Sequence, residues 1–345
     1  MNLRKQDTVS VLPSKKAGKS SKAKILITGA GGFLGSHICR YFGEAGHPVA
    51  AVGRFHAALD LMNAYPNLVL LGGMTLPDAS FREVVTKFQP DLLIHCAGTA
   101  SVKDSVEDPY KDFQRTVDVC AYTLETLRRY RPECFFVLFS SASVYGNPIS
   151  LPINEECPIT PISPYGFHKV MCEELVREYS LLHGLSTAIV RIFSAYGENC
   201  QKQVIHDLCR KLLLSQGNTI EVLGTGKESR DFIHGRDIAA AIDAIFRKRT
   251  RGVFNLGSGE ETTIRELFPL LARGLGMNKT AAFTGHTRKG DPLFWRADIS
   301  RMKTLGFKPR ISLVQGTKAY CQWLLGQERA SWSAVPQLHE MSVKV

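Results

Sequence analysis

The sequence predicts an α/β fold in which a doubly wound parallel sheet is joined to a smaller C-terminal α/β lobe. Through residue 190, short apolar runs typical of buried strands alternate with longer stretches of helical periodicity. Beyond about residue 195 the texture changes, because glycine-rich turns separate shorter helical stretches. Regular alternation of strands and helices predicts a parallel sheet with helices on both of its faces.

The predicted elements follow in order along the chain. In the first part, strands are predicted at 24–28, 48–52, 67–71, 91–96, 135–140 and 186–191, and helices at 33–45, 55–64, 79–88, 110–130 and 165–183. In the second part, helices are predicted at 203–215, 235–248, 263–274 and 298–305.

Composition excludes several classes of protein. No apolar run approaches the roughly 20 residues that span a bilayer, so no membrane segment is expected. The nine cysteines show no C-x-x-C pair and no metal-ligand spacing, which predicts reduced thiols, no metal site and a cytoplasmic protein. Residues 1–24 contain seven Lys or Arg and one Asp, so they hold +6 of the +11 formal charge. We expect a disordered, solvated basic tail rather than a nucleic-acid-binding arm.

The first predicted strand runs directly into the octet Thr28-Gly29-Ala30-Gly31-Gly32-Phe33-Leu34-Gly35, where a helix begins. A strand, a glycine-rich turn and a helix form the fingerprint of a Rossmann dinucleotide-binding fold. Gly29 permits the tight turn, Gly32 lets the backbone approach the pyrophosphate, and Gly35 lets helix and strand pack closely. The helix N-terminus attracts the phosphates. The cofactor-binding residues expected here are Gly29, Gly32, Phe33, Leu34 and Gly35.

A second motif, Tyr165-Gly166-Phe167-His168-Lys169, places a phenol and an ammonium group on one face of a helix. Free tyrosine has a pKa near 10, so a tyrosine that works as a base at pH 7 needs roughly 4 kcal/mol of extra stabilisation of its charged form. A neighbouring Lys169 cation and an oxidised nicotinamide are suited to supply it. Ser141, in the cluster Ser140-Ser141-Ala142-Ser143, is expected to form a hydrogen bond with the substrate oxygen whose proton Tyr165 takes. We therefore predict Ser141, Tyr165 and Lys169 as catalytic residues.

With these motifs in this order, the chain resembles the extended short-chain dehydrogenases/reductases, specifically the nucleotide-sugar epimerase/dehydratase branch (UDP-glucose 4-epimerase-like). The resemblance covers residues 24 to about 325 and includes further stretches at 95–98, 191–197, 224–237, 254–259 and 288–298. It implies a Rossmann domain at 24–193 and a nucleotide-sugar-binding lobe at 194–330, some segments of which return to the first domain. A basic tail (1–23) and a flexible C-terminus (331–345) flank them.

The resemblance also implies roles for individual residues. Ala97 and Thr99 fall in the turn that lies along the cofactor, and Tyr165 and Lys169 of the later helix are expected to bind the cofactor as well. Arg230 matches an arginine that grips the pyrophosphate of the sugar nucleotide, although a salt bridge to Asp231 or Asp237 is the alternative for its side chain. The full set of expected substrate-binding residues is Ser143, Ser194, Arg230, Arg288 and Asp291.

The chain departs from the family pattern at the cofactor. An NAD-specific fold usually has an acid at the end of the second strand, but here Gly53 and Arg54 stand there. Arg54 can accept a 2′-phosphate, which points to NADP, or it can stack on adenine, which leaves NAD; both readings stay open. The segment 71–74 lacks the acid often found beside the adenine.

Other departures lie nearer the substrate. Thr116 stands where the family usually has asparagine, and so does Ser194. Dehydratases of the family place two acids immediately after the catalytic hydroxyl, whereas this chain has Ala142 and Ser143, which cannot act as general acid or base at pH 7. The sequence therefore disfavours dehydration.

Three functions are compatible with these observations. The leading one is a nucleotide-sugar epimerase, acting at C4 of a UDP-hexose-like substrate with a tightly held NAD. The alternative is an NADPH-dependent reductase of a 4-keto nucleotide sugar, which Arg54 favours. A non-catalytic dinucleotide sensor or nucleic-acid-binding protein is the third.

A homodimer is also expected by resemblance, through the helices at about 105–130 and 165–183. Apolar residues of the second helix, such as Val170, Leu175 and Tyr179, are candidates for the interface but suit the chain's own sheet equally well.

Overall fold

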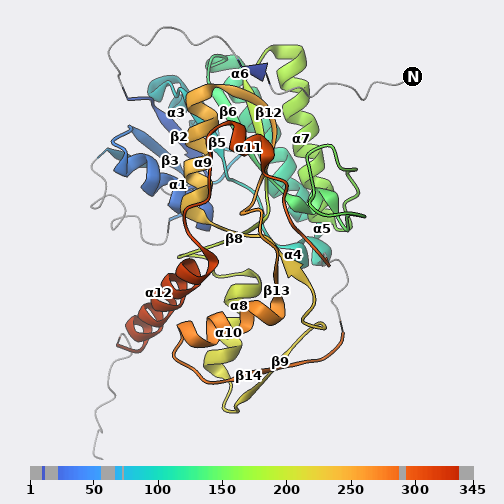
Figure 1. The fold of residues 1–345 in the computed structure, drawn as a ribbon. Coiled ribbons are helices and arrows are strands. Elements are labelled where there is room, and N and C mark those ends of the chain that lie inside the picture. Colours follow the sequence, from blue (N-terminus) through green and yellow to red (C-terminus); the bar gives the residue numbers. More distant parts are fainter. Residues whose placement is uncertain (1–9, 12–21, 56–66, 72–73, 287–292, 334–345) are drawn as a thin grey trace, which may run out of the picture.

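The computed structural model describes residues 10–11, 22–55, 67–71, 74–286 and 293–333 (Figure 1). Most of the predicted basic tail and the predicted helix at 55–64 therefore lie outside the described residues, and so do Arg288, Asp291 and residues 334–345. No helix in the described ranges is both long and apolar enough to cross a membrane.

The main sheet has the strand order β1-β12-β7-β6-β5-β2-β3-β4. Every pairing in it is parallel except that of the two-residue β1 with β12. From β2 the chain builds outward to β3 and β4, then returns to add β5, β6 and β7 on the other side, so the strand order reverses between β2 and β5. Ligands of such sheets bind at this reversal, outside the carboxyl ends of the strands. The strands are β1 (Ser10–Val11), β2 (Ile25–Thr28), β3 (Val49–Val52), β4 (Leu68–Leu71), β5 (Leu92–His95), β6 (Phe135–Ser141), β7 (Thr187–Ile192) and β12 (Thr250–Leu256).

Helices cover both faces of the main sheet because its strands are apolar on both sides. In β2, Ile25 and Ile27 face one core and Leu26 faces the other. The first core holds α1 (Phe33–Glu44), α9 (Gly235–Lys248) and α11 (Ser300–Thr304) against the sheet. The second holds α3 (Ser80–Phe88), α6 (Val119–Tyr130) and α7 (Pro164–His183). This two-faced burial is what a parallel sheet requires, and the predicted fold class is confirmed.

The smaller lobe lies beyond the carboxyl ends of these strands, below the sheet in Figure 1. Its core is formed chiefly by apolar side chains of three helices, α8 (Gln203–Leu214), α10 (Ile264–Gly274) and α12 (Leu313–Ser333). Short two-stranded sheets complete it. Their strands are β8 (Ser194–Tyr196) with β11 (Phe232–His234), β10 (Ser229–Arg230) with β13 (Thr262–Thr263), and β9 (Thr219–Val222) with β14 (Thr280–Phe283).

The predicted strands and most predicted helices are present with ends shifted by one or two residues. The predicted helix at 110–130 is wrong in one respect, because it is built from α5 (Pro109–Phe113), a π-helical turn η1 (Gln114–Asp118) and α6. The strand β12 was not predicted, because Arg251 and Gly252 interrupt its apolar run. Three helices were not predicted either, namely α4 (Val102–Glu107), the short η2 (Ala142–Tyr145) and the long α12.

Candidate active site

The glycine-rich turn between β2 and α1 is closely surrounded on one side and open on the other. Gly29 has φ +68°, and a Cβ there would lie 2.7 Å from the Ala97 nitrogen. A Cβ on Gly35 would lie 2.3 Å from the Gly29 carbonyl oxygen. At Gly32 a Cβ would meet only the Gly29 oxygen, at 3.2 Å, within the described residues. Gly32 thus offers bare backbone to a ligand, whereas Gly29 and Gly35 allow the turn to pack.

The start of α1 suits a diphosphate. Gly32 is its N-cap, and no side chain caps the helix. The side chains of Phe33 and Leu34 are half-buried and pack against the core, and their backbone lies in the first turn of α1. Uncapped N–H groups at a helix N-terminus form an anion site. The residues present therefore fit a dinucleotide cofactor.

The end of β3 has no carboxylate. A Cβ on Gly53 would approach the nitrogens of Ala30 and Gly31 to 3.2 and 3.3 Å, so Gly53 lies directly against the fingerprint turn. The backbone of Arg54 follows it closely, since a Cβ on Gly31 would meet the Arg54 oxygen at 1.8 Å. The Arg54 side chain is exposed. An exposed guanidinium beside the turn is compatible with both roles predicted for Arg54.

Lys169 links three parts of the site. It is 6% exposed, and its Nζ donates a hydrogen bond to the Phe139 carbonyl at 3.0 Å. The same Nζ lies 5.7 Å from the centre of the Tyr165 ring. A Cβ on Gly98 would come within 3.8 Å of it, so the ammonium group also reaches the turn that carries Ala97 and Thr99. The structure brings the predicted Tyr-Lys pair and the predicted cofactor turn together.

Ser141 ends β6, next to this group. Its Oγ accepts a hydrogen bond from the Ser143 amide at 3.2 Å, which leaves its O–H proton to donate elsewhere. The Ser143 hydroxyl is buried and has no hydrogen-bond partner within the described residues. These two hydroxyl groups are suited to bind a polar substrate.

A buried ion pair that sequence reasoning missed anchors α7 next to the predicted catalytic residues. Arg191 of β7 donates three hydrogen bonds to the carboxylate of Glu173 of α7, at 3.0, 3.2 and 2.7 Å. Ser140 donates to Glu173 as well, at 2.5 Å. Because Glu173 lies one helical turn beyond Lys169, this network fixes α7 relative to β6 and β7. The signal in the sequence is the acid four residues after Lys169.

Arg230 and Ser194 lie together on the lobe side of the site. The Ser194 amide donates to the Asp231 carbonyl at 2.9 Å, so Ser194 is beside the segment that carries Arg230. The Arg230 guanidinium lies 5.6 Å from the Trp295 ring centre. The indole of Trp295 in turn donates to the Gly146 carbonyl at 3.2 Å, which ties this group to the turn after Ser141.

Asp231 and Asp237, the two carboxylates named above as alternative partners of Arg230, accept hydrogen bonds from backbone amides. Asp231 accepts hydrogen bonds from the amides of Ser258, Gly259 and Ala297, at 2.6, 2.9 and 3.0 Å. Burial nevertheless raises the pKa of this carboxyl to about 6. Asp237 accepts from the amides of Arg310 and Ile311. Asp231 therefore links the segments at 258–259 and 297 to the strand that precedes it, which carries Arg230.

His37, Glu198 and His234 form a buried cluster with the ligand types that metals use. His37 Nε2 lies 2.9 Å from the Glu198 carbonyl oxygen, which can only accept, so this nitrogen carries a proton. His234 Nδ1 accepts from the Arg236 amide, which places the proton on Nε2, 3.4 Å from the Glu198 carboxylate. His37 Nδ1 and Glu198 Oε2 are buried and have no hydrogen-bond partner within the described residues.

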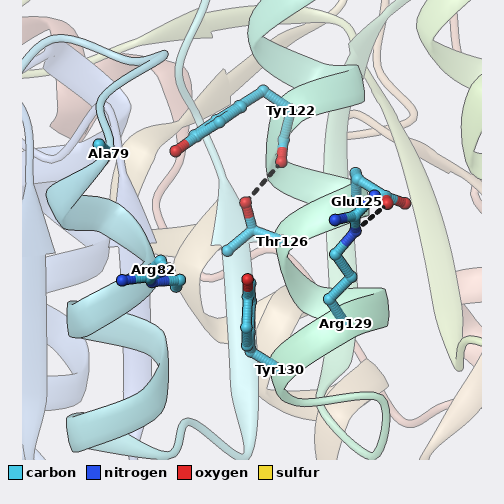
Figure 2. Close-up of a pocket in the computed structure, with 7 residues that line it drawn as sticks. All are labelled: Ala79, Arg82, Tyr122, Glu125, Thr126, Arg129 and Tyr130. Carbon is cyan, nitrogen blue, oxygen red and sulfur yellow. Dashed lines mark hydrogen bonds and ion pairs between the residues drawn. The ribbon is translucent and has the colours of Figure 1, made fainter.

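A surface pocket of about 290 Å³ lies between α3 and α6 (Figure 2). None of the predicted site residues lines it. Its acid, Glu125, accepts hydrogen bonds from Arg128 and Arg129, and the bond from Arg128 is the main cause that lowers the pKa of Glu125 to about 2. The lining residues are Ala79, Arg82, Tyr122, Glu125, Thr126, Arg129 and Tyr130.

Residues 25–257 match the NAD dependent epimerase/dehydratase family, which is more than half of the chain. The chain belongs to this family. A putative UDP-glucose 4-epimerase of Methanocaldococcus jannaschii is 31% identical over 309 residues, which cover 88% of this chain and 99% of that protein.

Solved structures similar to this chain support the same family assignment. UDP-glucose 4-epimerase from Thermotoga maritima, with UDP-glucose, has a TM-score of 0.80 at 26% identity, and the match covers 88% of this chain and 99% of that one. UDP-glucuronic acid 4-epimerase from Bacillus cereus, in complex with UDP-glucuronic acid and NAD, has a TM-score of 0.79 at 25% identity, with the same coverage.

Proposed function

We propose that this member of the epimerase/dehydratase family is a UDP-hexose 4-epimerase that keeps a nicotinamide dinucleotide bound between turnovers. The observation that carries the proposal is the convergence of Lys169, the Tyr165 ring and the Gly98 turn, with Ser141 at the end of the neighbouring strand. The relatives named as 4-epimerases support it.

The residues divide the work in a simple way. The chemistry that a bound nicotinamide dinucleotide supplies is reversible hydride exchange with C4 of the sugar. Tyr165, whose ring centre lies 5.7 Å from the Lys169 ammonium nitrogen, takes the proton of the 4-hydroxyl group and later returns it. Ser141 donates a hydrogen bond to the same oxygen and steadies the 4-keto sugar. Because the proton goes back to the sugar, the cycle leaves Tyr165 as it began.

The residues after Ser141 distinguish this reaction from dehydration. Ala142 is fully buried and apolar, and Ser143 carries only a hydroxyl. Elimination of water needs a general acid and a base near C5 and C6, and neither residue supplies one at pH 7. The pair therefore supports epimerisation over dehydration.

For the substrate we propose a uridine diphosphate sugar whose pyrophosphate meets Arg230. A guanidinium group pairs well with phosphate oxygens, and its place beside Trp295 holds it at the lobe side of the site. The relatives act on UDP-glucose or UDP-glucuronic acid by their names, so the identity of the hexose is the part of the proposal to be tested.

The cofactor that we propose is NAD, as in the family description and in the Bacillus cereus structure. Arg54 favours the second candidate function, an NADPH-dependent reductase of a 4-keto nucleotide sugar. An exposed arginine with no carboxylate on the preceding residue suits a 2′-phosphate.

One assay separates these candidates. Freshly purified protein is given UDP-glucose, UDP-glucuronic acid or UDP-N-acetylglucosamine without added cofactor, and the products are resolved by chromatography. We expect the C4 epimer of at least one of them to accumulate to equilibrium. Turnover that requires added NADPH and a 4-keto sugar nucleotide, with none for these three substrates, would establish the reductase instead.

A further inference from the structure

We propose that Asp112 and His168 are positioning residues that align the cofactor turn after β5 with the catalytic helix α7. The proposal rests on the proposed function, because it concerns how Tyr165 and Lys169 are held relative to a bound dinucleotide. Asp112 is on α5 and His168 is the residue before Lys169.

Asp112 bridges the two elements directly. It is 3% exposed, and it accepts a hydrogen bond from the Thr99 hydroxyl through one carboxylate oxygen. The other oxygen lies 2.5 Å from Nδ1 of His168, which is 8% exposed. Since a carboxylate only accepts, His168 Nδ1 carries the proton of this bond. One buried side chain thus joins the predicted cofactor turn to the catalytic helix.

The π-helical turn η1 closes this network. It carries Thr116, which is 1% exposed. The Thr116 hydroxyl accepts from the Thr99 amide at 3.3 Å and lies 3.2 Å from the Thr99 hydroxyl. Single π turns inside helices often occur at functional sites. Here the turn places Thr116 beside the residue that Asp112 also holds.

A further contact reaches α7 at Tyr165 itself. The Tyr165 amide donates to the Ser105 hydroxyl at 3.1 Å, and Ser105 is fully buried on α4. The segment from Thr99 to Thr116 therefore leaves the predicted cofactor turn, contacts α7 at Tyr165 and His168 and returns to Thr99. A contact that only held α5 against α7 would not need to include Thr99, which lies in the predicted cofactor turn.

The alignment matters because hydride and proton transfer both depend on geometry. A displacement of about 1 Å of a reacting group can cost 100-fold in rate. Loss of Asp112 frees the Thr99 turn and the first turn of α7 to move independently. We expect this loss to lower kcat and the affinity for the dinucleotide more than it changes KM for the sugar nucleotide.

The test uses the full chain with two pairs of variants, assayed well below their melting temperatures. Asp112→Ala and His168→Ala are each expected to lower kcat by about 10- to 100-fold, weaken NAD⁺ binding in calorimetry and leave KM for the UDP-hexose within about twofold. His168→Asn keeps an N–H donor near the place of Nδ1 and is expected to recover most of kcat. Asp243→Ala is the control, because it removes a buried carboxylate of α9 that bonds Tyr41 and Arg247 instead.

The outcomes are distinct. If Asp112→Ala and Asp243→Ala lose similar melting temperature while kcat and NAD⁺ affinity stay at the wild-type level, the pair is only a structural staple and the proposal is wrong. If Asp112→Ala does not fold, the contrast between His168→Ala and His168→Asn decides in the same way. If the wild type turns over no UDP-hexose, the proposed function fails, and NAD⁺ affinity alone still tests the positioning role.

Discussion

In the proposed mechanism Tyr165 and Lys169 work as a pair, because their spacing of four residues puts both side chains on one face of α7 and because Lys169 is held by a hydrogen bond. The Lys169 ammonium group is buried and bonded to the Phe139 carbonyl, so it cannot swing away from the Tyr165 ring. At this scale the chemistry depends on a single hydroxyl group.

Tyr165→Phe removes that hydroxyl group and little else. We expect kcat to fall by about 100- to 10,000-fold, the usual range for a general acid–base residue, with the affinity for the UDP-sugar largely kept. Tyr179→Phe is the matched control, because Tyr179 lies on the same helix and its hydroxyl bonds Glu125. Steady-state kinetics and calorimetry measure both quantities, and near-normal turnover in Tyr165→Phe would refute the mechanism.

Some residues of the candidate site could be predicted from the sequence, and others could not. The glycines of the fingerprint and the Tyr-Lys pair are spaced by local geometry, so their grouping could be predicted. Asp112 could not, because it meets His168 across 56 residues of sequence and through a π turn that interrupts an otherwise regular helical pattern. The backbone partners of Asp231, likewise, come from loops distant in the chain.

Among the elements, α1 and the turn before it show how close packing creates a binding surface. Gly35 lets α1 rest on the turn, and that contact holds Gly32 open at the helix N-terminus. The helix is amphipathic, with Ile38, Cys39 and Phe42 fully buried against the sheet. Its N-terminus is therefore fixed where phosphates are expected.

Gly35→Ala tests this arrangement. The added Cβ would lie 2.3 Å from a backbone oxygen, so α1 must shift. We expect stability to fall by about 1–3 kcal/mol, as for other overpacked sites, and NAD⁺ affinity to fall at least tenfold. Gly326→Ala on α12 is the control, since nothing in the described residues lies within 4 Å of its Cβ. Denaturant titration and calorimetry compare the two, and wild-type NAD⁺ affinity in Gly35→Ala would contradict the role of α1.

Strands were easier to predict than helical irregularities. Buried parallel strands are short apolar runs, so β2, β3 and β5 stand out in the sequence. The strand β12 does not, because Arg251 and Gly252 interrupt its pattern and its pairing with β7 is set by the whole sheet. The ends of helices and strands depend on tertiary contacts, and so does a strand such as β12 that joins the sheet late in the sequence. Local sequence patterns do not predict these contacts.

Across the whole molecule, buried histidines limit stability in acid. Burial lowers the pKa of His37 from 6.5 to about 4 and that of His95 to about 3. Between pH 6.5 and these folded-state pKa values, the two histidines are protonated in the unfolded chain but neutral in the folded chain. The free energy of unfolding therefore falls as the pH drops.

For His37 the full loss is roughly 3 kcal/mol by pH 4. Urea unfolding from pH 7 to pH 4.5 is expected to show the decline, and His37→Gln is expected to flatten it because glutamine does not titrate. An unchanged slope in His37→Gln would show that other groups govern acid unfolding.

The outer face of α5 and α7 exposes apolar side chains. Val170, Leu175 and Tyr179, which the sequence offered as interface candidates, pack against the chain's own cores. Other apolar side chains are exposed instead, namely Tyr110, Phe167 and Met171, at 72%, 52% and 43%. We expect this face to form a homodimer, since exposed apolar patches mark association sites.

Met171→Glu tests the dimer. A charge placed on this apolar face is expected to shift the protein from dimer to monomer in analytical ultracentrifugation. Leu214→Glu on α8, where Leu214 is 66% exposed, is expected to leave the dimer intact. A wild-type protein that sediments as a monomer would contradict the assembly without affecting the proposed chemistry.

The central claim is that hydride leaves C4 of the sugar and returns to the same carbon. The most direct measurement uses the best UDP-hexose substrate labelled with deuterium at C4, with the product analysed by mass spectrometry and NMR. The account predicts that the epimer keeps its deuterium at C4 and that no reduced cofactor accumulates. Deuterium lost from C4, or moved to another carbon of the sugar, would contradict it.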